Sequence, residues 1–287
     1  MFEGIPSKTA IGPAVRRATE SAKSESKRIC YDEYAKYFIT RRSTAIGETW
    51  IPRFLVNLYL DCWTEIGVGN LVVVRTRYFD DAIRQAKKEG IEQLVILGAG
   101  YDSRAYRLID PGEGIAAFEV DFPATQARKR SILEKTPGWP FPHVLYIPVD
   151  FINETLEEAI QKSDFRPDRK TFFLWEGVTF YLTGEAVQKT LSFIRRTAAP
   201  GSRISFDYLH FMPETRPYTR KTWHDREEPL LWGIDPEEMP GFLRDLGFVS
   251  IQNETAVEVG KRYCQELWIR NRVVSPTFSL VQADIPG

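Results

Sequence analysis

A glycine-rich junction between an apolar strand and a helix constrains this chain more than any other feature of its sequence. Residues 94–108 read LVILGAGYDSRAYRL, where an apolar run enters Gly98-Ala99-Gly100 and a helical pattern follows. Glycines at such a turn let a ligand approach the backbone, and the helix N-terminus behind them favours negative or polar groups. The next apolar run ends at Asp121, about 20 residues further on, where a carboxylate can accept hydrogen bonds from both hydroxyls of a ribose. This spacing predicts a nucleoside-binding site.

Two nucleoside cofactors compete for a site of this kind. A dinucleotide fingerprint requires a third glycine, G-x-G-x-x-G, but that position holds Ser103, so the pyrophosphate contact of the motif has no support. S-adenosylmethionine (SAM) has a ribose and an adenine but no pyrophosphate, so one glycine pair suffices. Glu119 shares the strand face of Asp121, yet Asp121 lies at the strand tip and is preferred for the ribose. The sequence therefore favours SAM.

After Gly90, short apolar runs alternate with helical stretches, which is typical of a parallel sheet with crossover helices. Before residue 91 the pattern is helical, notably over 53–66 and over 77–89, which ends at Gly90. The expected strands are 93–98, 115–120, 143–148, 170–175 and 202–208. The expected helices between them are 103–109, 123–135, 153–163 and 184–198, the last of them capped by Thr183.

The C-terminal third begins with a long segment that shows neither the hydrophobic periodicity of a helix nor that of a strand. Residues 210–234 are rich in Pro, Arg and Trp, and a loop of this length inside a compact domain is typical of a lid or a binding loop. Asp235-Pro236 followed by Glu238 predicts a helix start, and Gly247 predicts its end. Three further segments are expected: β-like runs over 248–254 and 262–270, and a loose tail over 275–287.

Together these patterns predict an α/β fold with a doubly wound, seven-stranded sheet whose last strand is antiparallel. We expect an N-terminal helical cap over residues 1–90. The nucleoside-binding core then spans 91–287, includes the lid over 210–234, and forms a single compact unit with the cap.

Composition excludes several other classes of protein. The 38 Lys and Arg are balanced by 39 Asp and Glu, and a net charge of −1 argues against a dedicated nucleic-acid binder. Residues 71–74 form the longest aliphatic run, far below the ~20 apolar residues that span a bilayer. Residues 1–10 lack the apolar core of a signal peptide. The three cysteines form no C-x-x-C pair, which excludes a disulfide scaffold and a Cys-rich zinc site. We therefore expect a cytoplasmic protein without a metal or a membrane partner.

Two further strand ends carry acidic residues. Asp150-Phe151 follows the third expected strand, where the acid can accept a hydrogen bond from an adenine amino group and the ring can supply apolar contact. Glu176 follows the fourth expected strand. Because ligands of open α/β sheets bind at the carboxyl ends of the strands, these residues and Asp121 are expected to converge on one ligand.

Five sequence blocks, taken together, resemble the leucine carboxyl methyltransferase family. They are VRTRYFDDAI, LVILGAGYDSRAYRL, FEVDFPATQARKRSIL, VDF and LWEGVTFYLT, within a likeness that runs from about Lys27 to Arg270. That family includes the enzyme that methylates the C-terminal leucine of protein phosphatase 2A and bacterial enzymes that esterify polyketide carboxylic acids. The resemblance implies roles for these residues: Arg75 on the methionyl carboxylate of SAM, Gly98 and Gly100 in contact with SAM, Asp121 on the ribose, Asp150 at the adenine edge, Glu176 near the methionyl end, Tyr181 facing the methyl-transfer site, and Lys27 touching cofactor or substrate.

The chemistry of the acceptor decides whether a general base is needed. A carboxylate is already an anion at neutral pH and needs none, whereas a phenol or an alcohol does. His210 and His224, in the expected lid, are the candidate bases. We expect a SAM-dependent O-methyltransferase that esterifies a small, polyketide-like carboxylic acid. Methylation of a hydroxyl or of a protein C-terminal carboxylate stays open, as do a nicotinamide dehydrogenase and a non-catalytic SAM-binding interaction module.

Overall fold

The computed structural model describes residues 11–39, 67–150, 154–210 and 229–287. The helix expected over 53–66 lies outside the described residues, as do Phe151, His224 and most of the expected lid.

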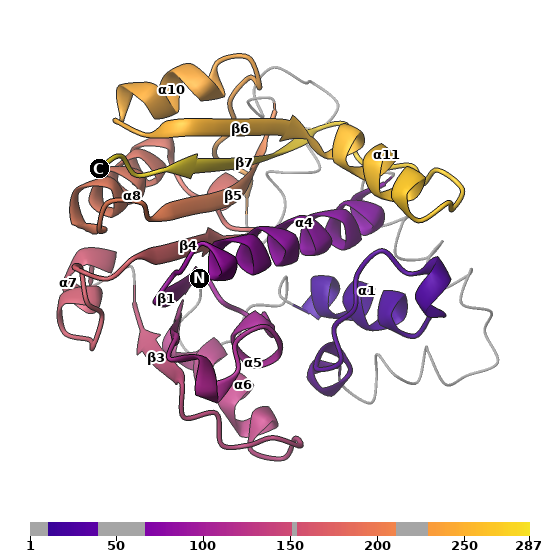
Figure 1. Ribbon diagram of the computed structural model, residues 1–287, viewed down its shortest axis with the longest axis horizontal. Helices are drawn as coiled ribbons and strands as arrows, with labels where there is room; N and C mark the ends of the chain where they lie inside the picture. Colours follow the sequence, from indigo (N-terminus) through magenta and orange to yellow (C-terminus); the bar gives the residue numbers. More distant parts are fainter. Residues whose placement is uncertain (1–10, 40–66, 151–153, 211–228) are drawn as a thin grey trace.

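A single seven-stranded sheet organises the described chain (Figure 1). Its strands are β1 (Gln93–Leu97), β2 (Ala116–Asp121), β3 (Val144–Pro148), β4 (Thr171–Trp175), β5 (Arg203–Leu209), β6 (Val249–Thr255) and β7 (Phe278–Asp284). The order across the sheet is β3-β2-β1-β4-β5-β7-β6, and β7 runs antiparallel to both of its neighbours. The pairs among the first five strands are parallel. This topology confirms the predicted doubly wound α/β sheet with one antiparallel strand.

Helices cover both faces of the sheet, which explains why β1 is buried along its whole length. Leu94 and Ile96 of β1 join one hydrophobic cluster, while Val95 and Leu97 join the other. The first cluster includes residues of α1 (Ile11–Ser21), α4 (Val68–Lys88), α5 (Arg104–Arg107), α6 (Pro123–Leu133) and α11 (Ala256–Glu266). The second includes residues of α7 (Leu156–Gln161), α8 (Gly184–Thr197) and α10 (Met239–Asp245). Short 3₁₀ turns occupy Glu25–Lys27, Ala35–Phe38, Pro111–Glu113 and Thr179–Tyr181.

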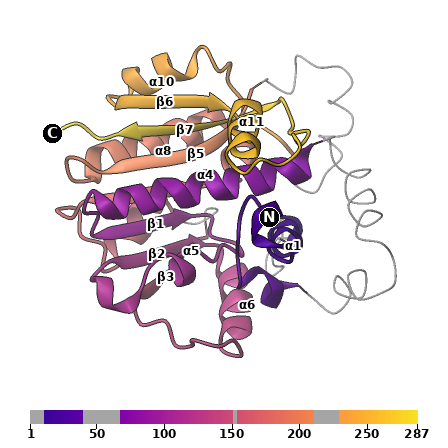
Figure 2. The ribbon, with the colours of Figure 1, turned by 45° about the vertical axis from the view of Figure 1, so that its right-hand side comes forward.

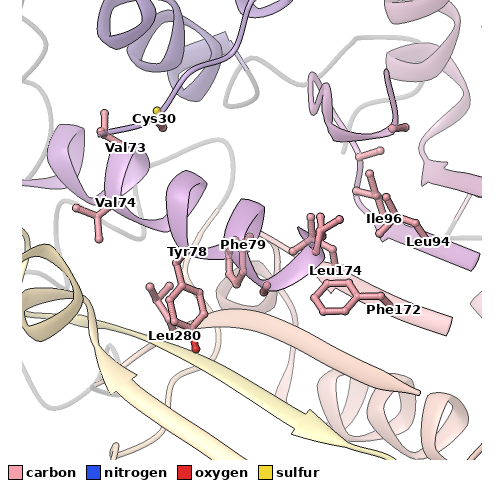
Figure 3. Packing of buried hydrophobic residues seen from close by; sticks show 14 of the residues in the cluster. Cys30, Val73, Val74, Tyr78, Phe79, Leu94, Ile96, Phe172, Leu174 and Leu280 are labelled. Carbon is pink, nitrogen blue, oxygen red and sulfur yellow. The ribbon is translucent and has the colours of Figure 1, made fainter. Parts of the chain in front are cut away.

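The helix α4 is the long element of the first face, and it begins nine residues before the predicted helix over 77–89. It lies along the sheet with α1 and α11 beside it (Figure 2). Its aliphatic run 71–74 is buried, and Figure 3 shows Tyr78 of α4 against Leu280 of β7. Gly90, with φ +81°, follows the helix end as predicted. The division of the chain at residue 91 stays a prediction.

The expected loose tail over 275–287 is wrong, because residues Phe278–Asp284 form β7. Leu280, Val281 and Ala283 are completely buried. The strand pairs with β5 on one side and β6 on the other, so it lies inside the sheet. This segment becomes a strand because it pairs with two strands that are distant in the sequence. The segment itself contains Ser, Gln and Asp, so its local sequence gives little indication of a strand.

The β-like run expected over 262–270 is also wrong, because α11 covers most of it. Thr255 and Glu258 form a capping box at its start: the Glu258 N–H donates to the Thr255 hydroxyl at 3.3 Å, and the Thr255 N–H donates to the Glu258 carboxylate at 3.0 Å. The T-x-x-E spacing was the local signal for a helix. The run expected over 248–254 is confirmed as β6.

The helix expected to start at Asp235 begins later, at Met239. Asp235 Oδ1 instead accepts a hydrogen bond from the Glu237 N–H at 2.9 Å and caps a turn. A helix that began at Pro236 would place Pro240 in its interior, where proline lacks the N–H and clashes with the preceding turn. The observed start keeps Pro240 in the first turn, and the helix ends before Gly247 as predicted. Thr183 caps α8 as predicted, by accepting from the Ala186 N–H at 3.3 Å.

Candidate functional site

A cavity of about 1480 Å³ opens at the carboxyl ends of the parallel strands. Among the described residues, its walls include the ends of β1, β2 and β4, parts of α1, α4 and α8, and residues 229–231. Pockets for one small ligand usually enclose roughly 300–1,000 Å³. The cavity therefore has room for a cofactor and an acceptor side by side.

The glycine turn forms the floor of the cavity next to β2. Gly98 and Gly100 have positive φ angles of +65° and +42°, and both line the cavity. A Cβ on Gly98 would lie 2.5 Å from a methyl carbon of Val178, so only glycine fits there. Ala99, between the two glycines, is buried and also lines the cavity.

Asp121 joins the end of β2 to this turn. Its carboxylate accepts hydrogen bonds from the Gly100 N–H and, at 2.6 Å, from the Phe122 N–H. Burial raises the pKa of Asp121, although these two N–H groups act in the opposite direction. A carboxylate has about four acceptor positions, so two remain for the hydroxyls of a ligand. Asp121 lines the cavity, and its role as the ribose acid stays a prediction.

Arg75 and Glu176 meet on the opposite wall. Arg75 Nε donates to Glu176 Oε1 at 2.9 Å, and Arg75 Nη1 donates to Asp207 Oδ2 at 2.7 Å. Burial disfavours the charged guanidinium, but Asp207 and Glu176 outweigh this and raise the pKa of Arg75. Nη2 of Arg75 lies 3.0 Å from where a Cβ of Gly177 would be, so the glycine lets the guanidinium approach the loop after β4. Arg75, Glu176 and Gly177 all line the cavity.

Sequence reasoning missed Asp207, which is completely buried in β5. Besides its contact with Arg75, the Asp207 carboxylate accepts a hydrogen bond from the Gly177 N–H at 2.6 Å. This bond fixes the loop that carries Glu176. The signal for it was an acidic residue within the otherwise buried strand RISFDYL.

Arg104 was also missed, although it lies in the glycine-turn block. Its guanidinium contacts Asp80 Oδ1 at 2.7 Å, Glu176 Oε2 at 2.6 Å and the carboxylate of Asp102. Burial would raise the pKa of Asp102, but Arg104 outweighs burial and lowers it to about 2. Because Arg104 is almost completely buried, it ties α4, the glycine turn and the loop after β4 into one charged cluster.

The N-terminal segment is fastened to the glycine turn by Arg17 of α1. Arg17 Nη2 donates to the backbone carbonyl of Tyr101 at 2.6 Å, and its Nε donates to Asp32 at 2.8 Å. Arg17 lines the cavity, so α1 closes one side of it.

The structure brings some predicted site residues to the cavity and leaves others away from it. Tyr181 lines the cavity beside Phe180, at 4.7 Å between ring centroids. Lys27 is exposed, and Asp150 is half-buried just beyond β3; neither is among the described residues that line the cavity. His210 is buried, with Nε2 at 2.6 Å from the hydroxyl of Ser279, and it is not among the described residues that line the cavity. The roles expected of Tyr181, His210, Lys27 and Asp150 stay predictions.

Within the described part of the chain, neither a membrane-spanning helix nor a cluster of metal ligands is found. No helix there is long and apolar enough to cross a bilayer. Within the same residues, no group of three or more His, Cys, Asp or Glu side chains is arranged to hold a metal ion.

Substituting Arg75 by lysine is expected to weaken SAM binding about 10-fold. Lysine keeps the positive charge but loses the planar fork that contacts Glu176 and Asp207 and that the predicted contact with the methionyl carboxylate requires. Titration calorimetry with SAM measures the change. Arg203→Lys is the matched control, because Arg203 also grips a carboxylate through two nitrogens but lies at the opposite end of β5. Equal SAM affinity in both variants would remove Arg75 from the ligand contacts.

Comparisons with known proteins agree with this geometry. A family model described as leucine carboxyl methyltransferase matches residues 10–195. A Mycobacterium tuberculosis protein, provisionally named as an S-adenosyl-L-methionine-dependent methyltransferase, is 35% identical over 229 residues and covers 73% of each chain. A protein of Frankia alni with the same provisional name is 33% identical over 202 residues, which cover 70% of this chain and 68% of that one.

Among solved structures, a provisionally named methyltransferase from Thermobifida fusca superposes with a TM-score of 0.56 at 16% identity. The match covers 99% of this chain and 97% of that chain, so the likeness of fold extends over essentially the whole molecule.

Proposed function

The chain belongs to the leucine carboxyl methyltransferase family and is a SAM-dependent methyltransferase, and we propose that it methylates the carboxylate of a small molecule. One observation supports the choice of acceptor: the described residues that line the cavity include no histidine, so His210 is not among them, while the other candidate base, His224, lies outside the described residues. A phenol or an alcohol would need a base there, whereas a carboxylate is already charged at neutral pH. Because the family consists of SAM-dependent methyltransferases, the alternative of a nicotinamide dehydrogenase is excluded. The cytoplasmic location stays a prediction.

The cavity residues suit the ribose and the methionyl part of a SAM molecule. The remaining acceptor positions of Asp121 suit the two ribose hydroxyls, beside the backbone of Gly98 and Gly100. Glu176 Oε2 is buried and lies 2.6 Å from the Arg104 guanidinium, but no described residue donates a well-oriented hydrogen bond to it. This oxygen suits the methionyl ammonium, and Arg75 next to it suits the methionyl carboxylate. The alternating charges of Glu176 and Arg75 match the zwitterion of an amino acid.

The protein's part in the reaction is alignment and exclusion of water. When bound, SAM supplies an electrophilic methyl group on a sulfonium. Because a carboxylate acceptor is already charged at neutral pH, no residue of the cavity would have to remove a proton from it. Tyr181 and Phe180 contribute aromatic surface to this part of the cavity and keep water from it. Holding acceptor and donor in line lowers the entropy lost at the transition state.

The acceptor class is tested with radiolabelled SAM and a panel of carboxylic acids, each paired with the alcohol of the same carbon skeleton. We expect label to enter the acids only. Mild base should then release that label as methanol, because methyl esters hydrolyse and methyl ethers do not. Label that stays bound to an alcohol or phenol after base treatment would contradict carboxylate methylation and support the alternative of hydroxyl methylation.

A further inference from the structure

Tyr101, the residue that follows the two glycines of the turn, is held from two sides by the N-terminal segment over residues 11–38. Its backbone carbonyl accepts a hydrogen bond from Arg17 Nη2 of α1 at 2.6 Å. Its ring stacks on Phe38, with 5.2 Å between the ring centroids and 21° between the ring planes. Arg17 and Tyr101 are both buried, and both line the cavity. The N-terminal segment therefore contacts the glycine turn itself.

The carbonyl that Arg17 holds lies next to the peptide that faces Asp121. The Gly100 N–H donates to the Asp121 carboxylate, and the Tyr101 carbonyl belongs to the following residue. Gly100 has a φ angle of +42°, and glycine restricts the backbone less than any other residue does. Residues 100–101 therefore have Asp121 holding one end and Arg17 the other, and losing either contact leaves this backbone more conformations.

A buried carboxylate fixes the direction of Arg17. Its Nε donates to Asp32 Oδ2 at 2.8 Å, and Asp32 Oδ1 accepts from two backbone N–H groups at 3.0 Å. Burial would raise the pKa of Asp32, but Arg17 and Arg107 outweigh burial and lower it. Asp32 is therefore charged at neutral pH, and it orients the guanidinium so that Nη2 reaches the Tyr101 carbonyl.

We propose that Arg17 is a positioning residue of the cofactor site, which sets the affinity for SAM by holding the glycine turn through the Tyr101 carbonyl. This assignment rests on the proposed placement of the SAM ribose between Asp121 and the glycine turn, and it holds for any acceptor. A ligand binds more weakly when the conformation that it requires is only partly populated, by the factor of that population. Arg17 keeps the turn in the required conformation before SAM arrives, so SAM does not have to order the turn on binding.

The test compares Arg17→Met with Arg272→Met as its matched control. Arg272 also holds one carboxylate and one backbone carbonyl of the N-terminal segment, Glu20 Oε1 at 2.8 Å and the Lys27 carbonyl at 2.8 Å. It is not among the described residues that line the cavity. SAM and S-adenosylhomocysteine are titrated into each protein by calorimetry. We expect Arg17→Met to weaken the binding of both ligands about 10-fold, the usual effect of losing a hydrogen bond from a charged donor, and Arg272→Met to leave both affinities within about twofold.

Hydrogen exchange in the ligand-free protein measures whether the substitution acts on the turn. The reporter is the Gly100 N–H, which is bonded to Asp121. We expect this hydrogen to exchange several-fold faster in Arg17→Met than in wild type, because local opening of the turn becomes easier. In Arg272→Met it should exchange at the wild-type rate, and the amide hydrogens of β1 should be unchanged in both variants.

Arg17→Lys separates the hold on the turn from the stability of the N-terminal segment. Its ammonium keeps a positive charge beside Asp32 and is drawn to that carboxylate more strongly than to a neutral carbonyl. We therefore expect the melting temperature of Arg17→Lys to lie close to the wild-type value while its affinity for SAM stays several-fold lower. A purely structural role of Arg17 would restore stability and affinity together.

Weaker SAM binding in Arg17→Met but not in Arg272→Met, with faster exchange at Gly100, supports the assignment. Wild-type affinity in Arg17→Met, an equal loss in Arg272→Met, unchanged exchange at Gly100, or full recovery of affinity in Arg17→Lys overturns it. No acceptor enters these measurements, so their result is independent of carboxylate methylation, which the labelled acids test. The placement of the ribose is tested by a substitution of Asp121 itself.

Discussion

Replacing Arg104 by methionine is expected to lower the melting temperature by about 10 °C. The substitution keeps the apolar stem but leaves Asp80, Asp102 and Glu176 as buried carboxylates without their shared cation. Breaking a buried ion pair by removing one partner costs about 3–5 kcal/mol. For domains of roughly 150–250 residues, 1 kcal/mol corresponds to about 2–4 °C. Differential scanning calorimetry of the variant without ligand measures the shift.

The matched control for this prediction is Arg77→Met on α4, the helix that carries Asp80, a partner of Arg104. Arg77 pairs with Asp81 at 2.7 Å, but both side chains are about one-third exposed, so water replaces the lost partner. Exposed pairs contribute about 0–1 kcal/mol, and we expect a shift of only a few degrees. If Arg104→Met melts no lower than Arg77→Met, the buried cluster does not hold the site together.

The elements that could be predicted from the sequence are those whose signal is local. Strands β1 and β4 have nearly continuous apolar runs because both of their faces are buried along the whole strand. The glycine turn is equally local, since its positive φ angles require glycine at fixed positions. The strand β7 had no such signal. It is defined by pairing with β5 and β6, which lie more than twenty residues away along the chain.

The residues of the candidate site likewise fall into those that local sequence signals predict and those that only long-range contacts reveal. Asp121, Arg75 and Glu176 were found because strand ends and family motifs mark them, and the structure brings them to one cavity. Asp207 and Arg104 were missed because their importance lies in partners from other elements: Asp207 meets Arg75 across 132 residues.

The buried cluster has a charge that suits its proposed ligand. Arg75, Arg104 and Arg107 contact the carboxylates of Asp80, Asp102, Glu176 and Asp207, so the acids exceed the guanidinium groups by one. SAM carries one net positive charge, from a sulfonium and an ammonium against one carboxylate, and S-adenosylhomocysteine carries none. A surplus carboxylate in a buried site therefore favours the substrate form of the cofactor over its product.

Asp121→Asn is expected to reduce SAM affinity about 100-fold, the largest effect on ligand binding that we predict. Asparagine has one acceptor oxygen in place of two, and its amide N–H groups would oppose the N–H donors of Gly100 and Phe122. The lost hydrogen bonds from the ribose hydroxyls to a charged acceptor contribute about 1.5–3 kcal/mol each, and 1.4 kcal/mol is a factor of ten. Calorimetric titration with SAM measures the change.

Asp284→Asn is the control for Asp121→Asn, and the comparison tests the whole assignment of the nucleoside end. Asp284 also lies at a strand end and also accepts two hydrogen bonds, but both come from Arg203 at the edge of the sheet opposite the cavity. Its substitution should leave SAM affinity within twofold. Asp121 is expected to differ because its carboxylate links the glycine turn to the ligand, so changing it disturbs the floor of the cavity as well as the contact itself. Should both variants bind SAM equally well, the ribose does not lie at the end of β2, and the orientation of SAM between Asp121 and Arg75 has to be abandoned.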